Sequence, residues 1–168
     1  QAGTAVSTGV QNTIVGGFAG DALTTGQRNT ALGTYALSTE DTGSRSTAIG
    51  WYSLLMQNYN GIAYNTAVGY NSGGSITTGV NNSIVGALAG DALTTGTVNT
   101  IFGYTAGTNL ESGDSNVIIG SQAMNSANGT ESRNVAVGAN ALNVMDSDAS
   151  NYNVAVGYDA GKAVTTGT

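Results

Sequence analysis

Few residues of this 168-residue chain could perform covalent or metal chemistry. The sequence has no cysteine and no histidine, which excludes a thiol nucleophile, an imidazole base and a Cys/His zinc site. The segment 157–163, GYDAGKA, resembles a phosphate-binding loop, but it is one residue short and has Ala163 where Ser or Thr would bind magnesium. The acids are too sparse to suggest the paired carboxylates of a glycosidase. We therefore expect no enzymatic activity, no cofactor and no metal site.

Acidic residues offer oxygen ligands at two places. The segment 146–151 interrupts the repeat described below and contains four possible ligands: Asp146, Ser147, Asp148 and Asn151. It lacks the glycine bend and the distal glutamate of a calcium loop, so a solvated insertion is the favoured interpretation and a bound ion the alternative. Asp21 and Asp91 occupy equivalent places in two repeats, where we expect a turn or a solvent-facing role.

Aromatic side chains are the best candidates for a contact surface. Of the eleven aromatic residues (one Trp, eight Tyr, two Phe), seven follow a recurring glycine by one or two positions, and three more lie in the two longest repeats. If the rings are exposed beside Asn and Ser, they can bind a sugar or a protein surface. The alternative interpretation is that the rings pack between repeats or between chains. The candidate contact residues are Trp51, Tyr52, Tyr59, Tyr64, Tyr70 and Tyr152.

The charge balance excludes further classes. Four basic residues against ten acidic ones give a net charge of −6, so the chain cannot neutralise a run of phosphates and we expect no nucleic-acid binding. The longest apolar runs have four or five residues, which excludes membrane insertion by a helix. The first residues do not resemble a signal peptide, so we expect export to be encoded elsewhere or not used.

One short motif recurs nine times along the chain: a polar residue, then Thr, Ser or Val, two apolar residues and glycine. The copies end at Gly16, Gly33, Gly50, Gly69, Gly86, Gly103, Gly120, Gly138 and Gly157, at spacings of 17 to 19 residues. This period is too short for common helical repeats, and glycine and β-branched residues disfavour helix. We predict an all-β parallel β-solenoid of about nine coils over residues 1–168, with both ends cut within a repeat of a longer fibre.

Each coil is predicted to contain two short strands. The motif forms one strand of four or five residues, and a stretch of the type AxALTT forms the second, each ended by a glycine. The motif opens with asparagine in every copy except at Ser46, so we expect a row of stacked asparagines that hydrogen-bond along the rod.

Neither face of the motif strand has the composition of a solvent-exposed face. The first and third strand residues are Thr, Ser or Val and then Val, Leu, Ile or Phe, and the middle residue is Ile or Ala. One face can line the coil, but the other needs a cover, since a sheet with one wet face alternates apolar and polar residues. We predict that another copy of the same chain supplies this cover.

The boxes STAIG at Ser46–Gly50 and NVAVG at Asn134–Gly138 resemble the head repeats of YadA-type trimeric autotransporter adhesins. They are equally similar to Gly/Asn/Thr-rich repeats of bacteriophage tail fibres. The resemblance covers essentially the whole chain and implies a left-handed parallel β-roll with three chains side by side. The period of 17–19 residues is longer than those heads usually have.

Four functions remain to be compared. The favoured one is a homotrimeric fibre segment, either a bacteriophage tail-fibre shaft or a receptor-binding region of the virion that attaches to a host-surface glycan or protein. The head of an extracellular, cell-surface adhesin is the alternative, and a polysaccharide depolymerase has analogy as its sole support. An ice- or crystal-binding solenoid would need a uniform threonine face, but the row Thr13, Thr30, Thr47, Thr66, Ser83, Thr100 continues as Val117, Val135, Val154, which is typical of a core row.

Overall fold

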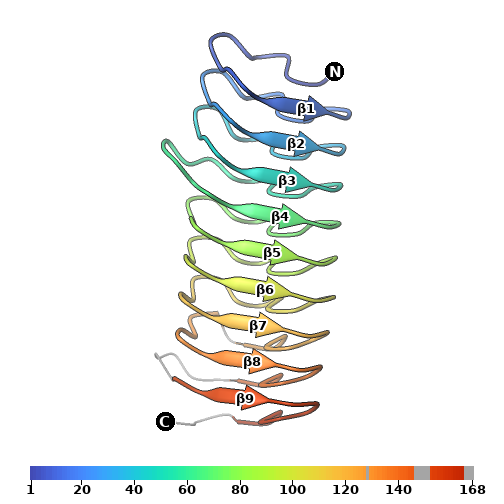
Figure 1. The fold of residues 1–168 in the computed structure, drawn as a ribbon, viewed down its shortest axis with the longest axis vertical. Helices are drawn as coiled ribbons and strands as arrows, with labels where there is room; N and C mark the ends of the chain where they lie inside the picture. The colour runs from blue at the N-terminus through green and yellow to red at the C-terminus, as the bar shows by residue number, and fades with distance from the viewer. Residues whose placement is uncertain (128, 146–151, 165–168) are drawn as a thin grey trace.

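The computed structural model describes residues 1–127, 129–145 and 152–164. The chain winds into a rod of about eight turns, in which nine short strands stack along one side (Figure 1). The strands are β1 (Thr13–Val15), β2 (Thr30–Leu32), β3 (Thr47–Ile49), β4 (Thr66–Val68), β5 (Ser83–Val85), β6 (Thr100–Phe102), β7 (Val117–Ile119), β8 (Val135–Val137) and β9 (Val154–Val156). The predicted parallel β-solenoid is confirmed, with strands of three residues instead of four or five.

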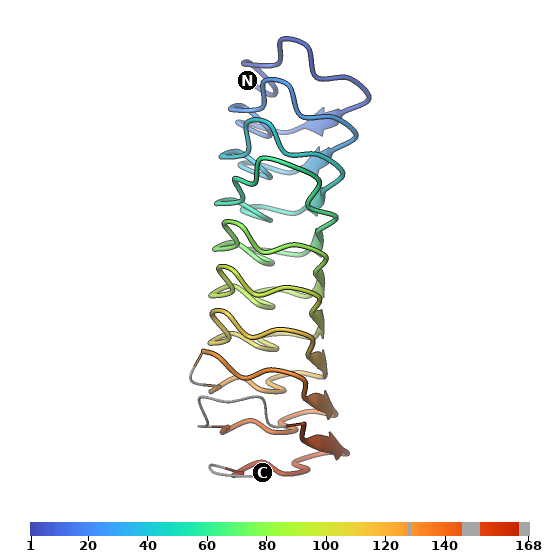
Figure 2. The same cartoon turned by 90° about the vertical axis from the view of Figure 1, so that its left-hand side faces the viewer.

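The nine strands form one parallel sheet whose order is the order of the chain. Ile84 pairs with Ile101 and Ile101 with Ile118, so each motif position lies above its equivalent in the next coil. Figure 2, turned by 90°, shows the strands on one side of the rod and the remaining loops of each coil on the other. Every position of the repeat therefore forms a row that runs along the rod.

The second predicted strand is wrong. In the described residues the AxALTT stretches form turns, and no strand is assigned outside the nine motif strands. Each coil bends at residues with positive φ, such as Phe18 (57°), Gly20 (49°) and Arg28 (59°), and such angles cannot continue an extended strand. The backbone still bonds along the rod, for example from Gly90 N–H to the Ala106 carbonyl at 2.9 Å.

The interior of the rod is complete within one chain. The middle strand residues point inward, and Ile84, Ile101 and Ile118 have 0% exposed surface. Turn residues such as Ala89 and Leu93 fill the rest of this thin core. The face left on the outside of the rod is therefore the one that carries the first and third strand residues.

The predicted asparagine row is confirmed as a buried ladder. Asn99 donates from its backbone N–H to Asn82 Oδ1 at 2.9 Å, and its own Oδ1 accepts the backbone N–H of Asn116 at 3.0 Å. Its Nδ2 also donates to the Gly113 carbonyl at 2.8 Å, which ties the turn to the strand. Positive φ at this corner belongs to the residue before the asparagine, such as Val98 (60°), and not to the asparagine itself.

Where Ser46 interrupts the asparagine row, a glutamine takes over. Gln57 and Glu40 are fully buried at a row that holds leucine or isoleucine in several other coils. Gln57 Nε2 donates to Ser46 Oγ at 2.9 Å and to Glu40 Oε2 at 3.0 Å, and its Oε1 accepts from Asn65 Nδ2 at 2.9 Å. Glu40 also accepts the backbone N–H of Gly43 at 2.7 Å. The buried network replaces the missing asparagine amide.

We expect leucine at position 57 to destabilise the rod although leucine fits this row elsewhere. Gln57→Leu leaves Asn65 Nδ2 and Glu40 Oε2 with fewer partners in a dry interior, which costs about 2–3 kcal/mol. Glu40→Leu breaks the same Gln57–Glu40 hydrogen bond from the other side and leaves the Gln57 amide without this acceptor. The double variant should therefore cost less stability than the sum of the two single variants. Urea unfolding of the two single variants and the double variant measures this coupling, and strict additivity would contradict it.

Candidate functional site

The described residues offer no obvious chemical centre. They contain no group of three or more acidic side chains that could hold a metal ion, and they form no pocket. The candidate ligands at 146–151 lie outside the described residues. The described part of the chain also has no helix with the length and apolar character of a bilayer span.

The phosphate-loop-like segment 157–163 is a turn whose lysine is engaged within the segment. Lys162 Nζ lies 3.3 Å from Asp159 Oδ1, and Asp159 also accepts from Asn140 Nδ2 at 2.8 Å. The lysine thus pairs with a carboxylate of its own turn, and this geometry does not favour a phosphate cradle.

Asp91, expected to serve a turn, is partly desolvated there. Its Oδ1 is buried without a hydrogen-bond partner, and burial raises the pKa of its carboxyl, while backbone hydrogen bonds from Asp91 and Ala92 oppose this shift. A raised pKa in the folded state means that the ionised carboxylate costs stability, and this cost falls as the pH drops through the raised pKa. Asp91 has the character of a tolerated turn residue, not of a site.

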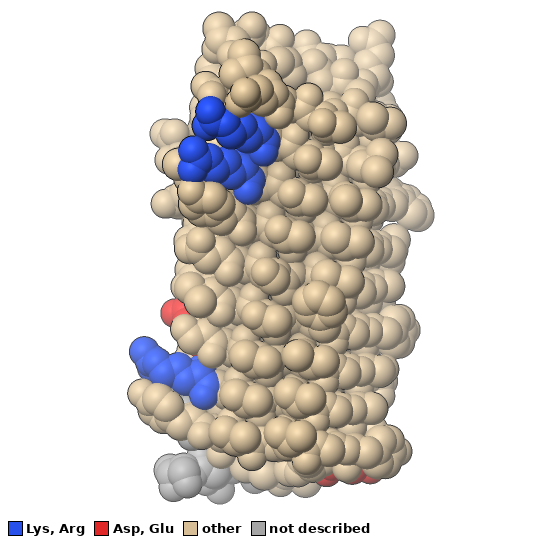
Figure 3. All heavy atoms as spheres, in the orientation of Figure 1, with Lys and Arg blue, Asp and Glu red and all other residues tan. Residues whose placement is uncertain are grey.

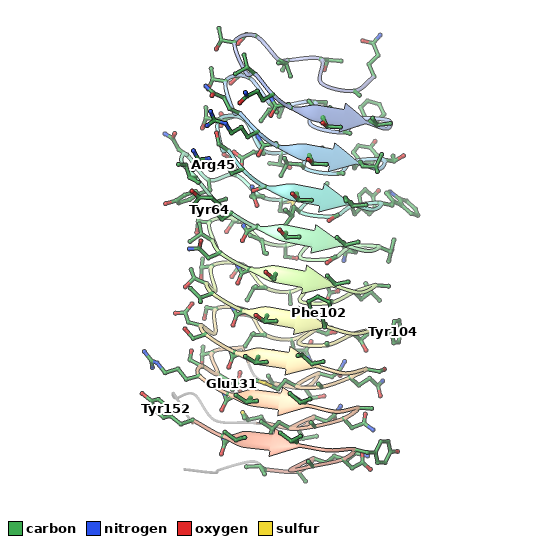
Figure 4. The ribbon with its side chains drawn as sticks, in the orientation of Figure 1. Arg45, Tyr64, Phe102, Tyr104, Glu131 and Tyr152 are labelled. Carbon is green, nitrogen blue, oxygen red and sulfur yellow. The ribbon has the colours of Figure 1, made fainter. Side chains whose placement is uncertain are left out.

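The six aromatic residues predicted as one contact surface lie at different places. Trp51, Tyr52 and Tyr70 follow the C-terminal ends of β3 and β4, whereas Tyr64 precedes β4 and Tyr152 precedes β9. Figure 4 shows Tyr64 and Tyr152 on the edge of the rod opposite to that of Tyr104. The half-buried Tyr59 lies in a loop, where its backbone N–H donates to Glu40 Oε2 at 3.2 Å.

The rings at the C-terminal ends of the strands form an aromatic ladder: Phe18, Tyr35, Tyr52, Trp51 and Tyr70. Phe18 stacks on Tyr35 with ring centroids 5.0 Å apart, and Tyr35 lies 5.4 Å from Tyr52. Trp51 continues the ladder at 4.9 Å from Tyr52 and 5.5 Å from Tyr70. The rings pack between coils, which supports the alternative interpretation, yet Phe18, Trp51 and Tyr70 remain about half exposed. The ladder therefore ties neighbouring coils together and leaves part of these three rings exposed to solvent.

The opposite edge carries a feature that the sequence analysis missed, the arginine row. This row is the position before each motif asparagine or Ser46, and all nine residues have positive φ: Gln11, Arg28, Arg45, Tyr64, Asn81, Val98, Ser115, Arg133 and Tyr152. It contains all three arginines of the chain. Aligning the motifs and looking one residue upstream would have revealed it.

Both tyrosines of this row contact the arginine of the preceding coil. The guanidinium carbon of Arg45 lies 5.5 Å from the ring centroid of Tyr64, and that of Arg133 lies 5.7 Å from the ring centroid of Tyr152. Such distances are those of cation–π pairs. Each pair stands where a 19-residue repeat ends, so the longer repeats and the Arg–Tyr pairs coincide.

Between the two edges lies the outward face, formed by the first and third residues of the nine strands. Several of its large apolar side chains are exposed, among them Val15, Leu32, Phe102, Ile119, Val154 and Val156. Phe102, in the labelled view of Figure 4, lies on β6 between the two edges. The threonine-to-valine row belongs to this face, so our interpretation of it as a core row is wrong; the middle residues fill the core instead.

Comparison with protein-family models, with curated proteins and with solved structures found no match to this chain. The resemblance to adhesin heads and tail fibres, with its left-handed winding and its three chains, stays a prediction.

Proposed function

We propose that this chain is a segment of a homotrimeric attachment fibre. The observation that carries the proposal is the outward face, an apolar surface on a rod whose interior needs no further residues. The favoured fibre is a bacteriophage tail-fibre shaft or receptor-binding region, located in the virion and directed at a host-surface glycan or protein. The head of an extracellular trimeric adhesin is the alternative.

The size of the outward face argues for a second copy. Nine strands at about 4.8 Å spacing form a face roughly 43 Å long, and the two outward rows give it an area of roughly 400 Å². The largest apolar patch on a soluble monomer typically has this size, and such patches are often functional. The flanking aromatic ladder extends it toward the approximately 800 Å² per partner of a stable interface. A closed ring of three copies, which the resemblance implies, covers every such face.

Native mass measurement of the full chain at micromolar concentration tests the proposal, and we expect three times the chain mass. Leu32→Lys combined with Phe102→Lys should give a folded monomer, because both side chains are exposed in the single rod and covered in the trimer. Thr25→Lys with Thr95→Lys adds the same charge on exposed turn residues four coils apart and should leave the trimer intact. A monomeric parent chain, or a lysine variant of the face that remains trimeric, would refute the proposal.

The neighbouring sequence in the parent gene separates the two kinds of fibre. An outer-membrane anchor barrel would indicate an adhesin, whereas a virion-attachment domain or a terminal folding chaperone would indicate a phage fibre. Either result leaves the trimer proposal in place.

An ice- or crystal-binding function is a second candidate because the row of threonines points outward. Thr13, Thr30 and Thr47 begin a regular, in-register ladder on the parallel sheet. The neighbouring third-residue row varies between Val, Leu, Ile and Phe, which breaks the uniform spacing that a crystal face requires. Thermal hysteresis of the protein solution would favour this candidate over the fibre.

A further inference from the structure

Arg28 and Arg45 form a pair of neighbouring cations on the arginine row. Parallel pairing of β2 with β3 places Arg28 one coil above Arg45, about 4.8 Å apart along the rod. Neither arginine forms an ion pair with a described residue, although the chain has ten acids. The space-filling view of Figure 3 shows basic side chains together near the N-terminal end, with no acidic side chain visible around them.

Neutral neighbours hold both side chains along this edge. Arg28 Nε donates to Gln11 Oε1 at 2.9 Å, which leaves its two terminal nitrogens for other acceptors. Arg45 donates from Nη1 to the Tyr64 hydroxyl beside the ring that it contacts. Arg28 and Tyr64 are exposed and Arg45 is half-buried, so the pair is both ordered and accessible.

The fold itself does not require arginine here. The same row holds Asn81, Val98 and Ser115, which make the same turn with φ near 60°. At such an angle glycine or asparagine is less strained than arginine, and two guanidinium groups one coil apart repel each other. A ligand of opposite charge accounts for both features.

We propose that Arg28, Arg45 and Tyr64 bind the acidic group of a polysaccharide, a carboxylate or a sulfate ester. Guanidinium groups recognise such planar or tetrahedral anions through paired N–H donors, and the half-exposed Tyr64 ring contacts the apolar side of the sugar. The inference rests on the proposed attachment function and specifies its ligand as an acidic glycan on the host surface.

Titration of the full chain at low ionic strength with polygalacturonate and with dextran sulfate tests this site. We expect binding to at least one of them and none to methyl-esterified polygalacturonate or to neutral dextran, because the esterified and neutral chains lack the anion. Comparing the two acidic chains shows whether the site prefers carboxylate or sulfate. Equal binding to single-stranded DNA would overturn the assignment to an acidic sugar.

Variants locate the binding. Arg28→Gln or Arg45→Gln should weaken it about fivefold, and the two together about twentyfold, the range of exposed charge-assisted contacts. Arg133→Gln is the matched control, because it removes the same charge from the same row. The neighbours of Arg133 in this row are Ser115 and Tyr152 instead of a second arginine, so the variant should change affinity less than twofold. A loss of affinity in Arg133→Gln equal to that in Arg28→Gln or Arg45→Gln would show that the net charge of the chain, and not the arginine pair, governs binding. This result would overturn the site.

Native mass of the same proteins separates this inference from the fibre proposal. A trimer that fails to bind either acidic polysaccharide overturns the glycan site alone. A monomer that binds through Arg28 and Arg45 overturns the trimer alone, since the site lies within one chain.

Discussion

Replacing Gly86 by alanine should unfold the middle of the rod, with a loss of more than about 4 kcal/mol in the free energy of unfolding. Gly86 has φ of 137°, a region that L side chains rarely adopt. A Cβ there would lie 2.4 Å from the carbonyl oxygen of Gly103 and 2.7 Å from its carbon. Both atoms are backbone of the next coil, so relief requires the two coils to separate. Thermal unfolding followed by far-UV circular dichroism measures the effect.

Two glycines of the same chain serve as controls for Gly86→Ala. Gly157 has a similar φ of 131°, but among the described residues a Cβ there would meet no atom nearer than 3.9 Å, so Gly157→Ala isolates the backbone strain from the clash. Gly17 carries no positive φ, and its Cβ would contact the Thr34 side chain at an ordinary 3.8 Å. We expect Gly17→Ala to be near neutral and Gly157→Ala to be intermediate. A loss at Gly86 no larger than that at Gly157 would show that coil stacking does not depend on these glycines.

The regular positions of the fold could be predicted because each has one dominant cause. A glycine every 17 to 19 residues marks a place where one coil passes so close to the next backbone that a Cβ does not fit, as at Gly86 and Gly103. Asparagine before the strand is the residue whose short amide bonds both along the row and to the turn, as Asn99 does. Composition and spacing therefore lead directly to stacked coils.

The turns could not be predicted in the same way. Positive φ occurs at Leu37 (52°), Val98 (60°) and Met124 (45°), which are residue types that avoid this region in isolation. Hydrogen bonding to the coils above and below imposes the angle, so a local preference gives no signal of it. The AxALTT stretch consequently suggested a strand where the structure has a turn.

Of the candidate site, the sequence pattern predicted the aromatic residues but not the Arg–Tyr pairs. Trp51, Tyr52 and Tyr70 follow the motif glycine and were expected near one another, and the structure places them in the aromatic ladder. The pairing of Arg45 with Tyr64 joins residues 19 positions apart, across one of the longer repeats. Such a contact becomes visible when the repeats are aligned on the motif asparagine and the preceding residues are compared. It is missed when residues are classed by how many positions they follow the motif glycine.

Truncating an asparagine of the buried ladder should cause the second-largest loss of stability, after that of Gly86→Ala. Asn99→Ala should lower the free energy of unfolding by about 3–4 kcal/mol, because it leaves several buried groups without a partner. Asn99 Oδ1 accepts from the backbone N–H of Asn116 at 3.0 Å and from its Nδ2 at 3.1 Å. Asn99 Nδ2 donates to the Gly113 carbonyl at 2.8 Å, and no water can replace it, since Asn99 is 1% exposed.

Two further variants show whether hydrogen bonding causes this loss. Asn58→Ala truncates an exposed asparagine and should stay within about 0.5 kcal/mol of the parent chain. Asn99→Asp keeps the shape of the side chain but turns an ionised oxygen toward the Gly113 carbonyl and Asn82 Oδ1, which accept hydrogen bonds. Its folded-state pKa should therefore be raised, so this variant should gain stability as the pH falls through that pKa, when the carboxyl regains a donor. Equal urea midpoints for Asn99→Ala and Asn58→Ala would contradict the ladder's role, because the interior would then hold the coils without it.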